Sequence, residues 1–280
     1  MGYKQKDEKL SLLKNYLRNS PFFWPLSRSI YRWFEPIFTH PLSCWGRYIR
    51  FFSDWRKYQS SGGNARFLNF YPCLHDKTSQ TKFDPQYFYQ AAWAASEIYR
   101  SHPLIHVDVA SDVKFVGVLS AITKVKFVDI RPLEANLRNL ECISGSILEL
   151  PFKSESVESL STLHVIEHIG LGRYGDPIDP NGAQKASKEL IRVLSVGGHL
   201  YLSIPIGSPR VQFNGLRTFS PLEVLELFKD LKLITAAYVD NHGKYYENVD
   251  ITTVEFDEKR GADFALGCFM FLKEVTTEIE

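Results

Sequence analysis

Histidine and glutamate lie close together in the segment His164–His168, which reads H-V-I-E-H. Histidine titrates near neutral pH and can take a proton from a reacting group, and a neighbouring carboxylate can stabilise the charged ring. Residues 157–165 have the pattern of a buried strand, so this pair is predicted to lie where a strand ends. We interpret His168 and Glu167 as candidate catalytic residues. A histidine that only stabilises the turn is the alternative.

The same five residues also spell H-x-x-E-H, the inverted zinc-peptidase motif, in which two histidines bind zinc and the glutamate activates water. That chemistry needs a helix that places His164 and His168 on one face. Here a strand pattern precedes the motif, and Gly170 and Gly172 follow it closely. A zinc hydrolase acting through His164, Glu167 and His168 is therefore a remote alternative, and no metal site is predicted.

Two aspartates, Asp108 and Asp129, are separated by about twenty residues, the spacing at which a dinucleotide-type fold places a carboxylate on a ribose. Asp108 lies in a short run rich in valine, and Asp129 closes the next such run. Asp129 is therefore predicted to accept hydrogen bonds from both ribose hydroxyls. An ordinary aspartate that caps the turn before Pro132 is the alternative.

The elements that must position these residues alternate between strand and helix from residue 104 onward. The predicted strands are residues 104–109, 125–130, 140–143, 157–165, 198–204, 231–239 and 264–273. The predicted helices are residues 115–121, 132–139, 183–194 and 221–228. This alternation predicts an α/β fold, a mostly parallel sheet with helices on both faces. Ligands of such sheets bind at the carboxyl ends of the strands.

The N-terminal region has a different composition. Residues 1–58 contain 11 lysines and arginines against 4 aspartates and glutamates, interleaved with aromatic residues and broken by prolines. We predict three parts: a basic, aromatic helical region at residues 1–60, a connecting segment at residues 61–101 that contains one helix, and the α/β domain at residues 102–280. The basic region could pack on the main domain, contact an anionic membrane surface, or hold single-stranded RNA.

The overall composition sets further limits. The 280 residues are 44% hydrophobic and 23% charged, a composition that excludes a disordered chain. The net charge of +1 gives no overall electrostatic attraction to nucleic acid. No DNA partner is expected. The four cysteines form no C-x-x-C pair, and neither a secretory signal nor a membrane-spanning run is visible. We expect a cytoplasmic protein, with peripheral membrane contact through residues 1–58 as one interpretation.

Two longer stretches carry a family resemblance. SGSILELPFKSESVESLSTLHVIEHIG (144–170) and KELIRVLSVGGHLYLSIP (188–205) resemble the class I S-adenosylmethionine-dependent methyltransferases. With HVDVASD, VDIRPLEANL, HVIEHIGLGRYGDPIDP and FNGLRTFSP, they look like an uncharacterised branch of that superfamily, a family of unknown function. The resemblance covers about residues 104–273. It implies a Rossmann-like fold with a seven-stranded sheet and S-adenosylmethionine as the cofactor.

The resemblance also implies which residues contact the cofactor: Asp108, Ala110, Ser111, Asp129, Ile130, Arg131, Ser146, Ile147 and His164. The sequence departs from the superfamily in the first loop, where Val109–Asp112 contain no glycine. Glycine there lets the backbone adopt positive φ and approach a ligand closely. Two functions therefore stay open, a methyltransferase and a catalytically inactive relative that serves as a binding or scaffold protein.

Two loops that follow predicted strands are rich in polar residues. They supply the candidate acceptor contacts, which are Arg173, Tyr174, Asp176, Arg210, Asn214 and Arg217. Arginines with tyrosine and asparagine suit a sugar, carboxylate or phosphate better than an apolar molecule. The expected acceptor is a polar small molecule or a glycan or glycolipid precursor, with His168 as the base when the nucleophile is a hydroxyl.

Overall fold

The computed structural model describes residues 44–254 and 264–275, and the chain divides into two compact units, Met1–Lys82 and Phe83–Glu280. The smaller unit contains α3 (Cys44–Ser60) and the 3-10 turn η1 (Phe67–Asn69). Phe70 is buried there, with its ring centroid 5.2 Å from those of both Phe51 and Trp55. Of the predicted basic helical region, residues 1–43 lie outside the described part.

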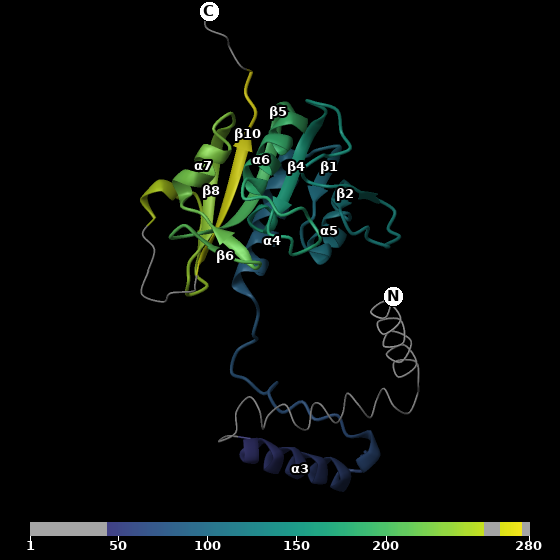
Figure 1. Ribbon diagram of the computed structural model, residues 1–280. Helices are drawn as coiled ribbons and strands as arrows, with labels where there is room; N and C mark the ends of the chain where they lie inside the picture. The colour runs from purple at the N-terminus through teal and green to yellow at the C-terminus, as the bar shows by residue number, and fades with distance from the viewer. Residues whose placement is uncertain (1–43, 255–263, 276–280) are drawn as a thin grey trace, which may run out of the picture. The chain divides into compact units, whose positions relative to one another are not determined.

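The larger unit is built on one eight-stranded sheet of order β3-β2-β1-β4-β5-β10-β8-β9 (Figure 1). Its strands are β1 (Ile105–Val109), β2 (Lys124–Asp129), β3 (Leu140–Ser144), β4 (Val157–Leu163), β5 (Leu194–Ile206), β8 (Lys232–Val239), β9 (Tyr245–Tyr246) and β10 (Ala265–Leu272). Strands β3 to β5 in this order are parallel, and β10 runs antiparallel to β5 and β8. The mostly parallel α/β fold is confirmed. The sheet has one strand more than the expected seven because the two-residue β9 pairs with β8.

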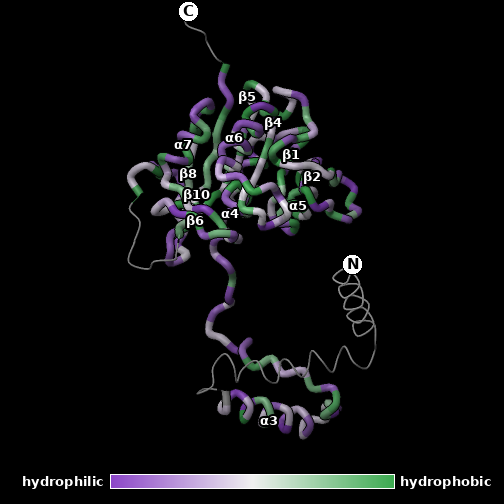
Figure 2. Tube along the Cα trace, in the orientation of Figure 1, coloured by the Kyte–Doolittle hydropathy of each residue, from purple (hydrophilic) through white to green (hydrophobic). Residues whose placement is uncertain are grey.

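Helices cover both faces of this sheet. The helices are α4 (Pro85–Ser101), α5 (Val113–Leu119), α6 (Gly182–Val193) and α7 (Pro221–Leu227). Side chains of α6 and α7 join one buried hydrophobic cluster, and those of α4 and α5 join the other. Figure 2 shows hydrophobic residues concentrated in the strands. Burial of this apolar surface on both sides stabilises the sheet at roughly 25 cal/mol per Å².

Local sequence explains where the helices begin. Asp84 caps α4, since its carboxylate accepts hydrogen bonds from the backbone N–H groups of Gln86 and Tyr87 at 3.0 and 3.3 Å. Ser220 and Glu223 form a capping box at the start of α7, where Pro221 occupies the first turn. The start of α4 is held at the carboxyl end of the sheet by other contacts: the Gln86 side chain donates to the Phe264 carbonyl at 3.0 Å, and the Tyr87 ring stacks on His164.

One local prediction is wrong, and one pair of strands was not predicted. Residues 132–139 form no helix, because Asn139 donates its side-chain N–H to the Ser120 carbonyl and Leu137 forms a β-bridge with Leu140. These bonds satisfy the backbone in an irregular connection. The loop after β5 contains an unpredicted hairpin of β6 (Arg210–Gln212) and β7 (Leu216–Thr218).

None of the described helices has the length and hydropathy that crossing a bilayer requires.

Candidate functional site

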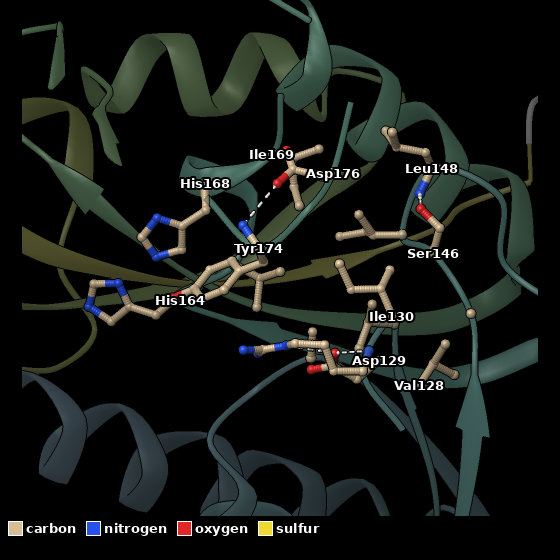
Figure 3. Close-up of a pocket in the computed structure, with 16 residues that line it drawn as sticks. Val128, Asp129, Ile130, Ser146, Leu148, His164, His168, Ile169, Tyr174 and Asp176 are labelled. Carbon is tan, nitrogen blue, oxygen red and sulfur yellow. Dashed lines mark hydrogen bonds and ion pairs between the residues drawn. The ribbon is translucent and has the colours of Figure 1, made fainter. Parts of the chain in front are cut away.

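A cleft opens at the carboxyl ends of β1, β2, β3 and β4 (Figure 3). Its lining residues are Val109, Ala110, Val128, Asp129, Ile130, Arg131, Gly145, Ser146, Ile147, Leu148, His164, Val165, His168, Ile169, Tyr174 and Asp176. The sheet order brings the four loops together, as expected for parallel strands.

Asp129 ends β2 and is only 8% exposed. Its Oδ1 accepts a hydrogen bond from the backbone N–H of Arg131 at 2.7 Å, and the Arg131 Nε lies 3.5 Å away. Its Oδ2 has no hydrogen-bond partner among the described residues. The carboxylate is therefore fixed in orientation through one oxygen, and the other remains available to hydroxyl donors in the cleft.

Two cleft residues at strand ends have a left-handed backbone although they are not glycine. Ala110 follows β1 with φ of 58°, and His164 follows β4 with φ of 59°. The Ala110 N–H donates to the Val128 carbonyl at 2.9 Å, which holds the first loop against β2. This loop thus adopts without glycine a backbone conformation that glycine adopts most easily.

Asp108 and Ser111 lie behind the cleft wall and do not line it. Both are buried, and Asp108 Oδ1 accepts from the Ser111 N–H at 3.1 Å while Oδ2 accepts from the Ser111 hydroxyl at 2.7 Å. The hydroxyls of Ser161 and Ser111 bind Asp108 and thereby oppose the effect of burial, which raises the pKa of Asp108 to about 6. The Ser111 hydroxyl also accepts from the Leu163 N–H at 2.9 Å. These two residues tie β1 to β4.

Glu167 lies in the 3-10 turn η2 (Ile166–His168) and is 0% exposed. Its Oε1 is 2.5 Å from His164 Nδ1 and 3.6 Å from His168 Nε2. An imidazole beside a carboxylate carries its proton on the facing nitrogen, so we assign the proton of His164 to Nδ1. Among the described residues, neither His164 Nε2 nor Glu167 Oε2 has a hydrogen-bond partner, although both atoms are buried.

His168 lines the cleft from the other side of this pair. Its Nδ1–H donates to the Gly215 carbonyl at 2.7 Å, which leaves Nε2 without a proton in the neutral ring. Burial lowers the pKa of His168 below 6.5, and the negative charge of Glu167 partly opposes this shift. The ring is therefore neutral at pH 7, and any proton that Nε2 accepts lies near a carboxylate.

The six predicted acceptor contacts have different positions. Tyr174 and Asp176 line the cleft, and Arg173 adjoins it by donating from Nη1 to the Gly215 carbonyl at 3.1 Å. Arg217 is buried, and its guanidinium donates to the carbonyls of Ile169, Asp179 and Pro180. It supports the loop and does not line the cleft. Arg210 and Asn214 belong to the β6–β7 hairpin and its turn, outside the lining.

Sequence reasoning missed Tyr87 of α4. Its ring stacks on His164 with centroids 5.3 Å apart and planes at 18°. Burial, followed by the charge of Glu167, raises the pKa of Tyr87. The sequence places Tyr87 only on one face of a helix, and no local pattern indicates that the start of this helix lies over the loop after β4. The apolar lining residues Leu148, Val165 and Ile169 were also missed, because no pattern in the sequence distinguishes an apolar residue that lines a cleft from one in the core.

The H-x-x-E-H segment does not form the helix that the zinc-peptidase motif requires. His164 follows β4 in a left-handed conformation, and Glu167 and His168 occupy a single 3-10 turn. Glu167 is bonded to His164. In residues 44–254 and 264–275, no cluster of three or more histidine, cysteine or acidic side chains has the geometry to hold a metal ion.

The cleft fits a nucleoside cofactor by the chemistry of its walls. Asp129 presents an unpaired carboxylate oxygen, a group that accepts hydrogen bonds from hydroxyls, and Ile130, 40% exposed, and Ile147 provide apolar surface. His164 supplies the unpaired Nε2 at the opposite wall. This combination of an apolar slot with a few polar atoms is typical of cofactor sites.

One family model matches part of the sequence. A family model described as "Caenorhabditis protein of unknown function, DUF268" matches residues 148–267. The match includes β4, the His164–His168 turn and the β6–β7 hairpin, and it leaves out β1, β2 and β3. No curated protein matches the sequence.

Solved structures share the fold at low sequence identity. A protein described as a sarcosine dimethylglycine methyltransferase from Galdieria sulphuraria has a TM-score of 0.52 and 14% identity, over 79% of this chain and 98% of its own. The [4+2]-cyclase SpnF has a TM-score of 0.53 and 10% identity, over 89% of this chain and 95% of its own. The fold is that of the class I S-adenosylmethionine-dependent methyltransferases. Because one of these two structures is a cyclase, the fold alone does not determine the reaction.

Proposed function

We propose that the protein transfers a methyl group from S-adenosylmethionine to a polar acceptor. The observation that carries this proposal is the placement of Asp129 and His168 on one cleft. A carboxylate suited to ribose ends β2, and a neutral histidine backed by Glu167 follows β4. The methyltransferase fold of the larger unit supports the same reaction.

Different residues of the cleft suit different parts of the cofactor. Asp129 would bind the ribose hydroxyls, Ile130 and Ile147 would contact the adenine, and the Ala110 backbone and the His164 ring would face the amino-acid end. When bound, S-adenosylmethionine supplies an electrophilic methyl group on a sulfonium. The contribution of the protein is then to hold an acceptor in line with that group and to exclude water.

His168 accepts the proton of an acceptor hydroxyl as a general base. Its Nδ1–H stays on the Gly215 carbonyl, so Nε2 is the atom that accepts. Glu167 Oε1, 3.6 Å from Nε2, stabilises the imidazolium that forms. This arrangement couples a neutral base at pH 7 with a buried counter-charge, as general base catalysis requires.

The polar rim of the cleft favours a polar acceptor. Tyr174 lines the cleft and Arg173 adjoins it, and both of these exposed side chains carry a polar group. We favour a glycan or glycolipid precursor. Transfer of a labelled methyl group from the cofactor to a saccharide extract tests this choice, and methylation only of apolar or protein fractions would contradict it.

Calorimetric titration with S-adenosylhomocysteine tests the cofactor site directly. We expect micromolar binding by the wild type and a ten- to hundredfold weaker Kd for Asp129→Asn, because the amide loses charge-assisted bonds to the hydroxyls. Asn keeps an acceptor for the Arg131 N–H, so the loop keeps its conformation. Glu134→Gln is the matched control, since Glu134 is an exposed acid of the same connection outside the lining.

The result also separates the two functions that the sequence leaves open. A folded wild type that binds no S-adenosylhomocysteine would place the protein among non-catalytic binding or scaffold relatives. Equal affinity in wild type and Asp129→Asn would remove Asp129 from the cofactor site.

A further inference from the structure

The charged groups around the cleft are not equally available to a ligand. Asp176 is occupied, because its carboxylate accepts from the backbone N–H groups of Gly170, Gly172 and Tyr174 at 2.6, 3.3 and 3.3 Å. One oxygen of Asp129 is held by the Arg131 N–H. Glu167 is fully buried beneath the histidines. None of these carboxylates forms an ion pair with Arg173.

Arg173 adjoins the cleft and has no acidic partner among the described residues. It is exposed, no carboxylate of the described residues lies within 4 Å of it, and its Nη1 shares the Gly215 carbonyl with His168 Nδ1. Its guanidinium therefore has unused donors next to the candidate base. By contrast, the guanidinium of Arg217 uses its donors on three carbonyls inside the protein.

A second guanidinium comes from the opposite rim. Arg131 follows β2, and its Cζ lies 4.5 Å from the ring centroid of Tyr174, while Arg173 Cζ lies 5.0 Å from the same centroid. Arg131 forms an ion pair with Asp129 through its Nε, 3.5 Å from Oδ1, and its guanidinium makes no hydrogen bond to another described residue. Arg131, from the end of β2, and Arg173, from the loop after η2, thus both lie against the ring of Tyr174 at the cleft (Figure 3 shows Tyr174 with Asp129).

We propose that the acceptor is an anion, a sugar or similar polar molecule that carries a phosphate or carboxylate group, and that Arg173 and Arg131 bind this group beside Tyr174. The inference rests on the proposed methyl transfer and adds the charge of its acceptor. Guanidinium groups form paired, charge-assisted hydrogen bonds with oxyanions. An anion bound there places the rest of the acceptor next to His168, because Arg173 and His168 share the Gly215 carbonyl.

Calorimetry of the full-length protein saturated with S-adenosylhomocysteine tests the proposal with three probes at physiological salt. The probes are glucose 1-phosphate, glucuronate and glucose, which differ in the anionic group. We expect at least one of the two anions to bind ten times or more tightly than glucose. The tighter of the two identifies the oxyanion as phosphate or carboxylate.

Arg173→Met should then weaken binding of the preferred anion by ten- to hundredfold, to the level of glucose. Arg173→Lys should retain part of the affinity through its charge. Arg138→Met is the control, because Arg138 is an exposed arginine outside the cleft lining. This variant should bind the preferred anion with the same affinity as the wild type. Equal binding of glucose, undiminished anion binding by Arg173→Met, or absence of binding by all three probes would overturn the proposal.

The same titrations distinguish this proposal from the function on which it rests. If the wild type binds no S-adenosylhomocysteine, the probes are titrated into the free protein. Anion binding that depends on Arg173 would then support the anion site while methyl transfer fails. Tight S-adenosylhomocysteine binding without anion selectivity would support the proposed cofactor site and contradict the anion site.

Discussion

Asp108 and Glu167 are both completely buried carboxylates that lie near histidines, but their hydrogen bonding differs. Both oxygens of Asp108 are bonded, to the Ser111 N–H and to the hydroxyls of Ser111 and Ser161. His106 is likewise bonded through both nitrogens, at 2.7 Å to Ser159 and 2.8 Å to Ser161. In the second cluster, Glu167 Oε2 and His164 Nε2 have no partner among the described residues.

We interpret this difference as one between a structural network and a candidate functional cluster. A buried polar group without a partner costs roughly 1–3 kcal/mol, so native proteins keep few of them. The Asp108 network is complete and joins β1 to β4, which are neighbours in the sheet. The Glu167 cluster is incomplete and adjoins the cleft, where a ligand could supply the missing bonds. We therefore expect substitutions in the first network to affect folding and those in the second to affect binding and catalysis.

The largest effect is expected for His168→Asn. Removal of the base should lower the rate of methyl transfer by roughly 10²–10⁴, about 3–5 kcal/mol in the barrier. Asparagine retains a donor for the Gly215 carbonyl, so the thermal midpoint should change little. Initial rates with labelled cofactor measure the effect, with His242→Asn at an exposed loop position as the control. A rate within threefold of the wild type would leave His168 a role in the turn only.

Asp108→Ala should have the largest effect on folding. The substitution removes the acceptor for three hydrogen bonds in a site without solvent, which should lower the free energy of unfolding by about 3–5 kcal/mol. Urea denaturation followed by circular dichroism measures this change. Glu134→Ala, at an exposed acid, should change stability by less than about 0.5 kcal/mol. A similar small change in Asp108→Ala would contradict the structural role of the network.

The same contrast shows what the sequence could predict. Alternation of apolar strands with short helices predicts the parallel sheet, and it places Asp129 and His164 at strand ends on one edge. These residues do line the cleft. Residues 132–139 have helical spacing but form no helix, because their polar groups find partners in Ser120 and Leu140. Such partners come from tertiary contacts that local spacing does not encode.

The roles of Asp108 and Arg217 could not be read from the sequence for a related reason. Asp108 lies only two residues before the cleft residue Ala110, yet its side chain is bonded to serines behind the cleft. Arg217 lies in a polar loop, yet its guanidinium is turned toward the carbonyls of Ile169 and Asp179. In both cases the direction of the side chain depends on bonds to another segment. Spacing predicts the position of a residue on an element but not this direction.

The pH dependence of stability should sharpen the comparison, because the first network contains two shifted groups of opposite sign. Burial raises the pKa of Asp108 from 3.8 to about 6, so the folded state binds more protons and stability falls as pH rises through this interval. Burial lowers the pKa of His106 from 6.5 to about 3, so the unfolded state binds more protons and stability falls as pH decreases from 6.5. Between about pH 4 and 6 the two slopes oppose each other.

Single substitutions should therefore reveal slopes of opposite direction. Asp108→Asn should lose stability more steeply than the wild type on acidification from pH 6 to 4, by roughly 3 kcal/mol at 1.36 kcal/mol per pKa unit. His106→Asn should instead gain stability over the same interval. Urea titrations at half-unit pH steps measure both slopes. Parallel curves for the two variants would show that these residues do not titrate as their burial implies.

Glu167→Gln is expected to have the smallest effect on stability and thus to discriminate most directly between the clusters. The amide oxygen can still accept from His164 Nδ1, and the amide N–H₂ replaces a carboxylate oxygen that has no partner, so the free energy of unfolding should change by less than about 1 kcal/mol. The charge of Glu167 opposes the lowering of the His168 pKa by burial, so its removal should move the acid limb of the pH–rate profile to lower pH. Turnover should fall about tenfold, because the imidazolium loses its counter-charge. A loss of stability comparable to that of Asp108→Ala, with an unchanged pH–rate profile, would mean that both carboxylates are structural and that the incomplete bonding around Glu167 has no part in catalysis.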